Sequence, residues 1–132
     1  MAGIFTRIIN RDLPGYIVAE ESLYIAFLDV RPLAIGHTLV VPKEEVDNLF
    51  DLGDSVFTGL MLFAKKIAIG IQKVIPCLRV GMAVVGLEVP HAHLHLVPLN
   101  DLHDINFKKT RLQLNQQTFR ETVKQLKTVI MN

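Results

Sequence analysis

Three of the five histidines in this sequence, His91, His93 and His95, occupy alternate positions in the stretch 89–98. Side chains of an extended strand point alternately to its two faces, so the three imidazoles are predicted to share one face. Residues two apart on a helix point in different directions, and prolines bound the stretch as they bound strands. The apolar residues that alternate with the histidines are predicted to pack on the opposite face: Ala92, Leu94 and Leu96.

A row of imidazoles on one face admits three interpretations. The first is a solvated polar face without chemistry, which strict alternation of three histidines disfavours. The second is a metal site. The Cα atoms of His91 and His95 would lie roughly 13 Å apart, too far to converge easily on one ion, so a metal would need His93, His95 and a third ligand from elsewhere. The third is phosphoryl chemistry, in which one of two neighbouring imidazoles attacks phosphorus and the other donates a hydrogen bond.

The segment 91–97, His-Ala-His-Leu-His-Leu-Val, resembles the signature of the histidine triad family of nucleotide-binding hydrolases and transferases. Three further segments resemble the other blocks of that family and follow in the same order: 25–30, 36–43 and 86–90. The resemblance covers about residues 4–98, and residues 99–132 add a C-terminal loop and helix. It implies a small-molecule nucleotide as the binding partner.

Composition predicts a single domain over residues 1–132, because half of the 132 residues are hydrophobic and can bury a core. A formal net charge of +1 gives no reason to expect a nucleic-acid partner. The single cysteine excludes an internal disulfide, and the amino terminus lacks a secretory signal pattern. Lys65 and Lys66 interrupt the most apolar stretch, short of the roughly 20 residues that cross a membrane. We therefore expect a cytoplasmic protein without membrane contact.

The remaining patterns predict an α+β fold. It has a mainly antiparallel sheet of about five strands, one long central helix and a C-terminal helix. Candidate helix caps are Asp54 for the long helix, and Asn115 or Thr118 for the last one. His37 is predicted to share a strand face with Leu39 and Val41. The predicted elements are helical turns at 4–10, a hairpin of 16–20 and 23–30, a strand at 37–42, a helix from 54 to Pro76, strands at 78–85 and 89–98, and a final helix around 119–130.

The resemblance implies a role for each histidine. In the family the middle histidine of the triad is the nucleophile, which is His93 here. It attacks the α-phosphate and gives a nucleotidyl-imidazole that water resolves. The resemblance further implies that His95, and His37 from another strand, donate hydrogen bonds to the non-bridging oxygens, where charge builds. His91 is the first residue of the triad and lies furthest along the strand from the phosphate.

The resemblance also implies a nucleoside pocket. Asp29 matches the ribose-binding carboxylate of the family, since a carboxylate accepts hydrogen bonds from both hydroxyls of a cis diol. The alternative is that Asp29 is a turn residue at the end of its strand, before Arg31 and Pro32. Phe27 and Val30 are expected to line the base pocket.

One departure from the family concerns zinc. Many relatives bind a structural zinc through two cysteines near the start, a histidine after the third strand and the first triad histidine. Here the corresponding positions are Gly3, Thr6, Glu45 and His91. A single ligand does not make a zinc site, so we expect neither a metal nor any other cofactor.

Two further departures bear on turnover. Relatives commonly carry an asparagine that contacts the phosphate in the loop before the triad, and residues 83–86 (Ala-Val-Val-Gly) contain none. Glu88 stands where relatives often place a residue that assists the leaving group, and its negative charge would face an anionic substrate. The leading interpretation is a nucleotidyl hydrolase or transferase. The alternatives are a nucleotide-binding regulatory module with little turnover, and a metal-binding protein that uses His93 and His95.

A homodimer is the expected assembly. The strand predicted at 78–85 is apolar and has an apolar helix beside it. An exposed strand edge with such residues needs a cover, and pairing with a second copy supplies one.

Overall fold

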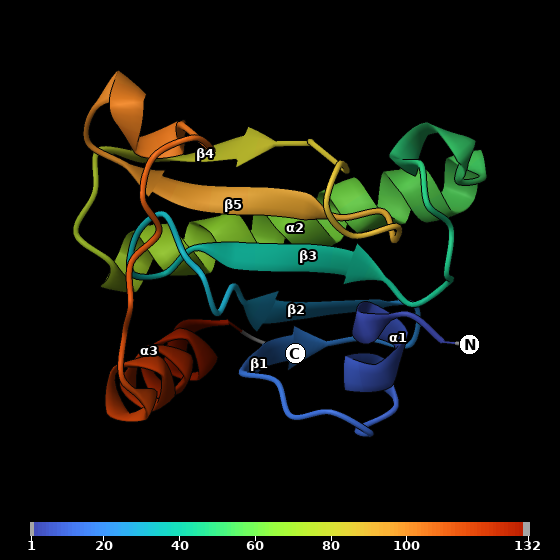
Figure 1. Ribbon diagram of the computed structural model, residues 1–132, viewed down its shortest axis with the longest axis horizontal. Coiled ribbons are helices and arrows are strands. Elements are labelled where there is room, and N and C mark those ends of the chain that lie inside the picture. Colours follow the sequence, from blue (N-terminus) through green and yellow to red (C-terminus); the bar gives the residue numbers. More distant parts are fainter. Residues whose placement is uncertain (1, 131–132) are drawn as a thin grey trace.

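The computed structural model describes residues 2–130, which form one five-stranded sheet and three α-helices (Figure 1). The strand order is β1-β2-β3-β5-β4, and every pair of neighbours is antiparallel. The α+β fold with five strands is therefore confirmed. In chain order the elements are α1 (Ile4–Ile9), β1 (Ile17–Glu20), β2 (Tyr24–Leu28), β3 (Thr38–Pro42), the 3₁₀ turn η1 (Leu49–Asp51), α2 (Asp54–Val74), β4 (Arg79–Ala83), β5 (Leu94–Leu99), the 3₁₀ turn η2 (Leu102–Ile105) and α3 (Gln116–Val129).

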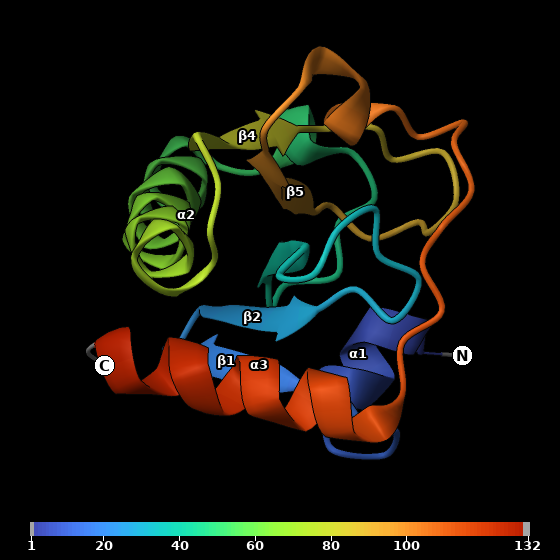
Figure 2. The ribbon, with the colours of Figure 1, turned by 90° about the vertical axis from the view of Figure 1, so that its left-hand side faces the viewer.

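The main hydrophobic core lies between one face of the sheet and the long helix α2 (Figure 2). The apolar stripe of α2 includes Leu60, Ile67 and Ile71, all with no exposed surface. The apolar residues that alternate with the histidines belong to this core, as predicted: Ala92, Leu94 and Leu96. Among residues 2–130, no helix combines the length and the apolar character that a membrane crossing requires.

The opposite face of the sheet carries a smaller core and the histidines. Helix α1 packs there through Phe5 and Ile8, against Phe27 of β2 and Leu39 of β3. Figure 2 shows that the segment between η2 and α3 also runs down this side of the sheet, away from α2. Two short pieces of chain therefore cover the histidine face, whereas the long helix α2, together with residues of α3, covers the other.

Gly36 sets the start of β3. Its φ of 97° lies in the left-handed region, where residues with a Cβ are strained. A Cβ at this position would also stand 3.0 Å from Ile75 Cγ1. The sharp turn ends at His37, so the chain enters β3 with that imidazole on the face shared with Leu39 and Val41, as predicted.

Two predictions at the ends of elements were wrong, and one was confirmed. β5 begins at Leu94, so His91 and His93 lie in irregular chain just before the strand. The residue that caps α2 is Gly53, without a side-chain hydrogen bond, and Asp54 is the first helical residue. Of the two candidate caps of α3, Asn115 is confirmed, because its side chain accepts the backbone N–H of Thr118.

The cap of α3 is testable because the two candidates differ in what they donate and accept. Asn115 Oδ1 accepts the N–H of Thr118 at 2.8 Å and its hydroxyl at 2.9 Å. Asn115→Ala should lower the free energy of unfolding by about 1 kcal/mol, measured by urea denaturation. Thr118→Ala, the matched control, removes only a hydroxyl donor and should cost less. A larger loss for Thr118→Ala would restore that residue as the cap.

Candidate active site

A cavity of about 330 Å³ opens on the histidine face of the sheet. Its wall comes from α1, the end of β2, the loop 85–89, the histidine stretch and the segment after η2. This volume lies in the range of small-molecule sites. The other two predicted site residues, His37 and His91, lie behind this wall. Six of the eight predicted site residues line it: Phe27, Asp29, Val30, Glu88, His93 and His95.

The ring of His93 is fixed by its own chain. Its Nδ1 lies 2.6 Å from the carbonyl oxygen of His91. A carbonyl only accepts, so Nδ1 carries the proton and donates it, and Nε2 of the neutral ring is left with a free lone pair. Within residues 2–130 Nε2 makes no hydrogen bond, and it is not buried, so it opens onto the cavity that His93 lines. A fixed imidazole with a free lone pair can act as a nucleophile.

His37 and His95 form a chain of hydrogen bonds. The partner of the first ring nitrogen fixes the tautomer of His37, and His37 in turn fixes the tautomer of His95. Nδ1 of His37 accepts the backbone N–H of Leu33 at 2.9 Å, so the proton of the neutral ring is on Nε2. That Nε2 donates to Nδ1 of His95 at 2.9 Å. The proton of His95 is then on its Nε2, which lies on the cavity side. His95 is therefore a hydrogen-bond donor toward the cavity, and His37 orients it from behind.

Burial keeps these imidazoles neutral. Desolvation, followed by repulsion from His95 and Arg111, lowers the pKa of His37 to about 3. Desolvation, followed by repulsion from His93 and Arg111, lowers the pKa of His95 to about 4. Desolvation also lowers the pKa of His93, partly offset by its hydrogen bond to the His91 carbonyl. At neutral pH His37, His93 and His95 thus supply lone pairs and hydrogen-bond donors without a positive charge.

His91 has a different environment from the other two triad residues. Its Nε2 donates to the carbonyl oxygen of Pro42, at the end of β3, at 2.7 Å. Its Nδ1 is buried without a hydrogen-bond partner. His91 therefore ties the irregular chain before β5 to the neighbouring strand, and in doing so it positions the carbonyl that holds His93.

Asp29 is a turn residue and a cavity residue at the same time. Its Oδ1 accepts the backbone N–H of Arg31 at 2.8 Å, which confirms the turn interpretation. Its Oδ2 lies 3.6 Å from Nε2 of His37 and remains on the cavity wall. Burial raises the pKa of Asp29, against the lowering effect of the Arg31 N–H.

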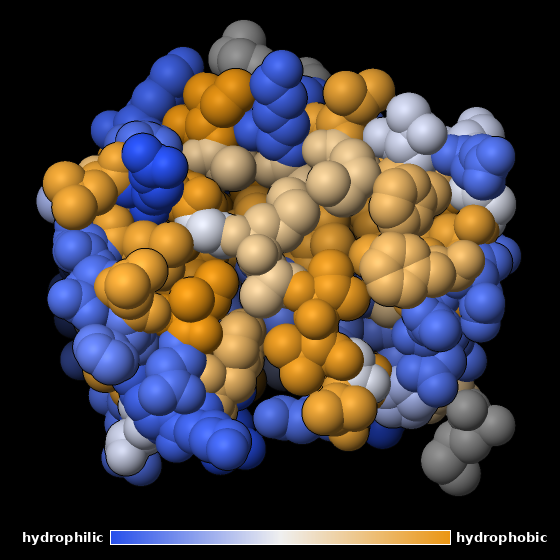
Figure 3. All heavy atoms as spheres, turned by 90° about the horizontal axis from the view of Figure 1, so that it is seen from above, coloured by the Kyte–Doolittle hydropathy of each residue, from blue (hydrophilic) through white to orange (hydrophobic). Residues whose placement is uncertain are grey.

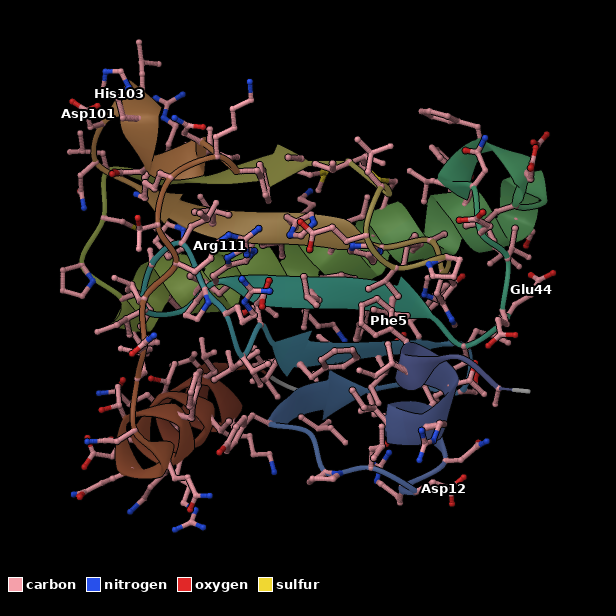
Figure 4. The ribbon with its side chains drawn as sticks, viewed as in Figure 1. Phe5, Asp12, Glu44, Asp101, His103 and Arg111 are labelled. Atoms are coloured by element: carbon pink, nitrogen blue, oxygen red, sulfur yellow. The ribbon has the colours of Figure 1, made fainter. Side chains whose placement is uncertain are left out.

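Phe5 of α1 is a site residue that the sequence interpretation missed. Its ring meets the ring of His93 edge-on, with centroids 5.1 Å apart, and lies 5.4 Å from Phe27. Figure 4 shows Phe5 pointing from α1 toward the strands that carry the site. The helical spacing of residues 4–9 indicated a docked helix, but no signal in the sequence indicated that it docks on His93.

Arg111 and Phe107, on the segment between η2 and α3, were also missed. The Arg111 side chain is 15% exposed and lines the cavity, and Figure 4 shows it reaching across the sheet. Its guanidinium lies 3.7 Å from Asp29 Oδ2 and 3.9 Å from Glu88 Oε1. Phe107 packs on the His95 ring, with centroids 4.7 Å apart. Both residues lie outside the segments that resemble the family, so the resemblance could not indicate them.

The residues at the family's zinc position meet, but they do not fit a zinc ion. Glu45 Oε1 accepts the backbone N–H of Gly3 at 3.0 Å and the hydroxyl of Thr6 at 2.6 Å. These hydrogen bonds lower the pKa of Glu45. There is no thiolate, and glycine offers no side-chain ligand. A carboxylate therefore joins the start of α1 to the chain after β3, where relatives use a metal.

One other group of side chains could hold a cation. Asp29, His37 and His95 offer ligand atoms within 4.8 Å of one another, and within residues 2–130 no group of three contains both His93 and His95. The hydrogen bond between the two rings already uses one nitrogen of each. The Arg111 guanidinium, 3.7 Å from Asp29, would also repel a metal ion. The metal-binding interpretation of His93 and His95 therefore finds no third ligand in the described part of the chain.

Comparison with known proteins agrees with this geometry. The profile of the HIT domain matches residues 10–102. An uncharacterised HIT-like protein of Borreliella burgdorferi is 34% identical over 131 residues, which cover 93% of this chain and 94% of that protein. An adenosine 5′-monophosphoramidase of Saccharomyces cerevisiae is 35% identical over 101 residues, which cover 76% of this chain and 64% of that enzyme. A zinc-bound histidine triad family protein from Mycobacterium smegmatis has a TM-score of 0.81 at 25% identity, covering 98% of this chain and 94% of that chain.

The neutral histidines predict how stability depends on pH. The pKa values of His37 and His95 are about 3 and about 4 in the folded protein, against 6.5 for an unperturbed histidine. Because the unfolded chain takes up these protons first, the free energy of unfolding should fall as the pH drops from about 6.5 toward 4. The slope should approach about 1.4 kcal/mol per pH unit for each histidine. Urea denaturation at a series of pH values measures it.

Two variants isolate the buried contribution to that slope. His37→Asn should flatten the slope by the share of one histidine. His103→Asn, a change of the exposed histidine in η2, should leave it unchanged. Equal slopes for the wild type and His37→Asn would mean that His37 is protonated in the folded protein.

Zinc content is predicted from the Glu45 contacts. Protein purified without added metal should contain far less than one zinc per chain by elemental analysis. The variant with Gly3→Cys, Thr6→Cys and Glu45→His should gain about one zinc per chain, because His91 keeps an unpaired Nδ1. Stoichiometric, chelator-resistant zinc in the wild type would show that another set of ligands exists.

Proposed function

Because this chain belongs to the HIT, or histidine triad, family, we propose that it is a nucleotide hydrolase or transferase of the histidine triad type. Its reaction is cleavage at the α-phosphate of a purine nucleotide ester, amidate or dinucleotide. The similarity to an adenosine 5′-monophosphoramidase supports this substrate class. The observation that carries the proposal is the fixed tautomer of His93, with Nδ1 on the His91 carbonyl and Nε2 free at the cavity.

His93 is the proposed nucleophile in a two-step reaction. Nε2 attacks the α-phosphorus, an N–P bond forms, and the bond from phosphorus to the leaving group breaks. As the bond forms, the ring becomes a cation whose Nδ1 keeps its proton and still donates it to the His91 carbonyl. Water then attacks the nucleotidyl-imidazole, its hydroxyl joins phosphorus and one proton passes to the solvent. The N–P bond breaks, which releases a nucleoside monophosphate and returns His93 to its neutral state.

The other histidines stabilise the transition state or position the residues that do the chemistry. His95 donates from Nε2 to a non-bridging oxygen, where negative charge accumulates in the transition state. His37 acts on the substrate only through His95, because both of its ring nitrogens have protein partners. His91 holds the carbonyl that orients His93 and does not touch the phosphate.

The nucleoside end of the substrate fits the apolar part of the cavity. We assign the ribose hydroxyls to Oδ2 of Asp29, since Oδ1 is occupied by Arg31 N–H. Phe27 and Val30 line the base pocket, and Phe5 and Ile8 of α1 extend it. Val30 is 61% exposed, so a base there remains accessible to solvent on one side.

A nucleotide-binding regulatory module with little turnover is the second candidate. The loop wall formed by Val85, Gly86 and Leu87 offers no side-chain donor to the phosphate. The Glu88 side chain is 76% exposed, which makes it a weak candidate for protonating a leaving group. A panel of adenosine and guanosine phosphoramidates and dinucleotides, assayed for nucleoside monophosphate release with and without a chelator, separates the two functions. Binding without release would favour the module.

We propose that residues 1–132 form one cytoplasmic domain that works as a homodimer. β4 is an edge strand whose outer side has no partner in the sheet. Figure 3, which views the molecule from the β4 side, shows a broad apolar surface. Two copies of β4 can pair across a two-fold axis and bury that surface together. Its exposed apolar residues include Leu62 and Ile69 of α2, and Leu78, Met82, Val84 and Val85 in and around β4.

The histidine variants test the mechanism through their order. His93→Ala should lose turnover by several orders of magnitude yet still bind a nucleoside monophosphate. His95→Ala should cost roughly 2.7 to 4 kcal/mol of transition-state stabilisation, because one donor is lost. His91→Ala should cost least in the chemical step. Acid-quenched wild type should carry a nucleotidyl adduct on His93 by mass spectrometry. An active His93→Ala protein, or an adduct elsewhere, would assign the nucleophile to another residue.

The homodimer is tested at the edge strand. Light scattering at micromolar concentration should give about twice the chain mass of 14.8 kDa. Met82→Asp, in the middle of β4, should give the monomer, because a carboxylate would have to be buried at the pairing edge. Leu23→Asp, an equally exposed apolar position in the β1–β2 turn, should leave the dimer intact. A monomeric wild type would remove the proposal.

A further inference from the structure

The segment that carries Arg111 is fastened to the site by main-chain groups. Nη1 of Arg111 donates to the carbonyl oxygen of Arg31 at 2.6 Å. The next residue, Leu112, donates its N–H to the carbonyl of Pro32 at 2.8 Å. Both acceptors belong to the turn that also holds Asp29. The guanidinium is therefore placed relative to the proposed ribose carboxylate, although it comes from the C-terminal part of the chain.

Arg111 has donors to spare. A guanidinium has five N–H donors, and one contact within residues 2–130, to the Arg31 carbonyl, is a hydrogen bond. The carboxylates of Asp29 and Glu88, at 3.7 and 3.9 Å, are too distant to accept hydrogen bonds. The Phe107 ring lies 5.5 Å from the central carbon and limits the orientation of the fork. The cavity thus contains an oriented cation with unfilled donors.

The charges around the cavity explain why a cation is needed there. Burial lowers the pKa of His93 and His95, so these rings bring no positive charge, and Asp29 and Glu88 both repel an anion. Arg31 also lines the cavity, but it is exposed to solvent, whereas the Arg111 side chain is mostly buried. The loop 85–87 adds only apolar and glycine residues. Arg111 is therefore the cation best placed to attract a phosphate into this cavity.

We propose that Arg111 is a phosphate-binding residue of this site, and that the docked segment 107–112 serves to place its guanidinium in the cavity. This inference rests on the proposed function. The guanidinium lies between Asp29, assigned to the ribose, and Glu88, at the leaving-group side, so the phosphate that joins those two parts of the substrate falls within its reach. Its planar fork matches two non-bridging oxygens of one phosphate.

A comparison of adenosine with adenosine monophosphate tests this assignment, because the two ligands differ only in the phosphate. Chemical-shift titration by NMR, which also reports weak binding, gives both dissociation constants. Arg111→Gln should weaken monophosphate binding by about ten- to a hundred-fold and leave adenosine binding unchanged. Arg111→Lys should recover part of the loss, since it keeps the charge without the fork. Arg120→Gln on α3, a matched control away from the cavity, should bind both ligands as the wild type does.

Each other outcome contradicts the assignment in a distinct way. Equal weakening of both ligands by Arg111→Gln would mean that the guanidinium only supports the turn at Asp29. Unchanged monophosphate binding, with a wild type that binds it, would overturn the role of Arg111 alone. A wild type that binds neither ligand would overturn the proposed function and this inference with it. Thermal unfolding of each variant verifies that it is folded.

Discussion

Strand alternation at β5 links the site to the hydrophobic core. Leu94 and Leu96 are fully or almost fully buried against α2, and His95 between them points to the opposite face. A shift of one residue in the pairing of β5 with β3 would send the imidazole into the core and a leucine into the cavity. The apolar burial that stabilises the fold therefore also fixes the direction of the ring. The pairing of His95 with Leu39 in β3 and Ala83 in β4 maintains this register from both sides.

In the cavity the lone pairs and the positive charge belong to different residues: the histidines supply the lone pairs and Arg111 supplies the charge. Burial removes positive charge from the histidines, so their nitrogens are available as a nucleophile and as neutral donors. Positive charge enters instead through the guanidinium of Arg111 on the cavity wall. A histidine that also supplied the positive charge would lose the lone pair that attack requires. Each group in the cavity thus has one task, and a modest change in pH does not exchange the tasks.

The sequence predicted what depends on periodicity and missed what depends on long-range docking. The alternation of 91–97 predicted the histidine face, and the apolar stripe after Gly53 predicted α2. The boundaries failed where a local choice decided them, as with Asp54 against Gly53 at the start of α2, because several neighbouring residues can cap the same helix. Phe5 and Arg111 could not be predicted. Their contacts, with His93 and with Asp29, join positions far apart in the chain. The helical spacing around Phe5 indicates a helix but not what the helix packs on, and Arg111 belongs to no family motif.

The Glu45 contacts hold α1 in place without a thiol, so oxidants do not act on this attachment. Phe5 meets His93 only while α1 is docked, and Glu45 fastens the start of α1 through Gly3 and Thr6. A cysteine-bound zinc at this place would release the helix when oxidants attacked its thiolates. A carboxylate, a hydroxyl and a backbone amide have no thiol to oxidise. The single cysteine, Cys77, lies between α2 and β4, well separated in sequence from these residues. Oxidation of a thiol therefore cannot detach α1 from its place beside His93.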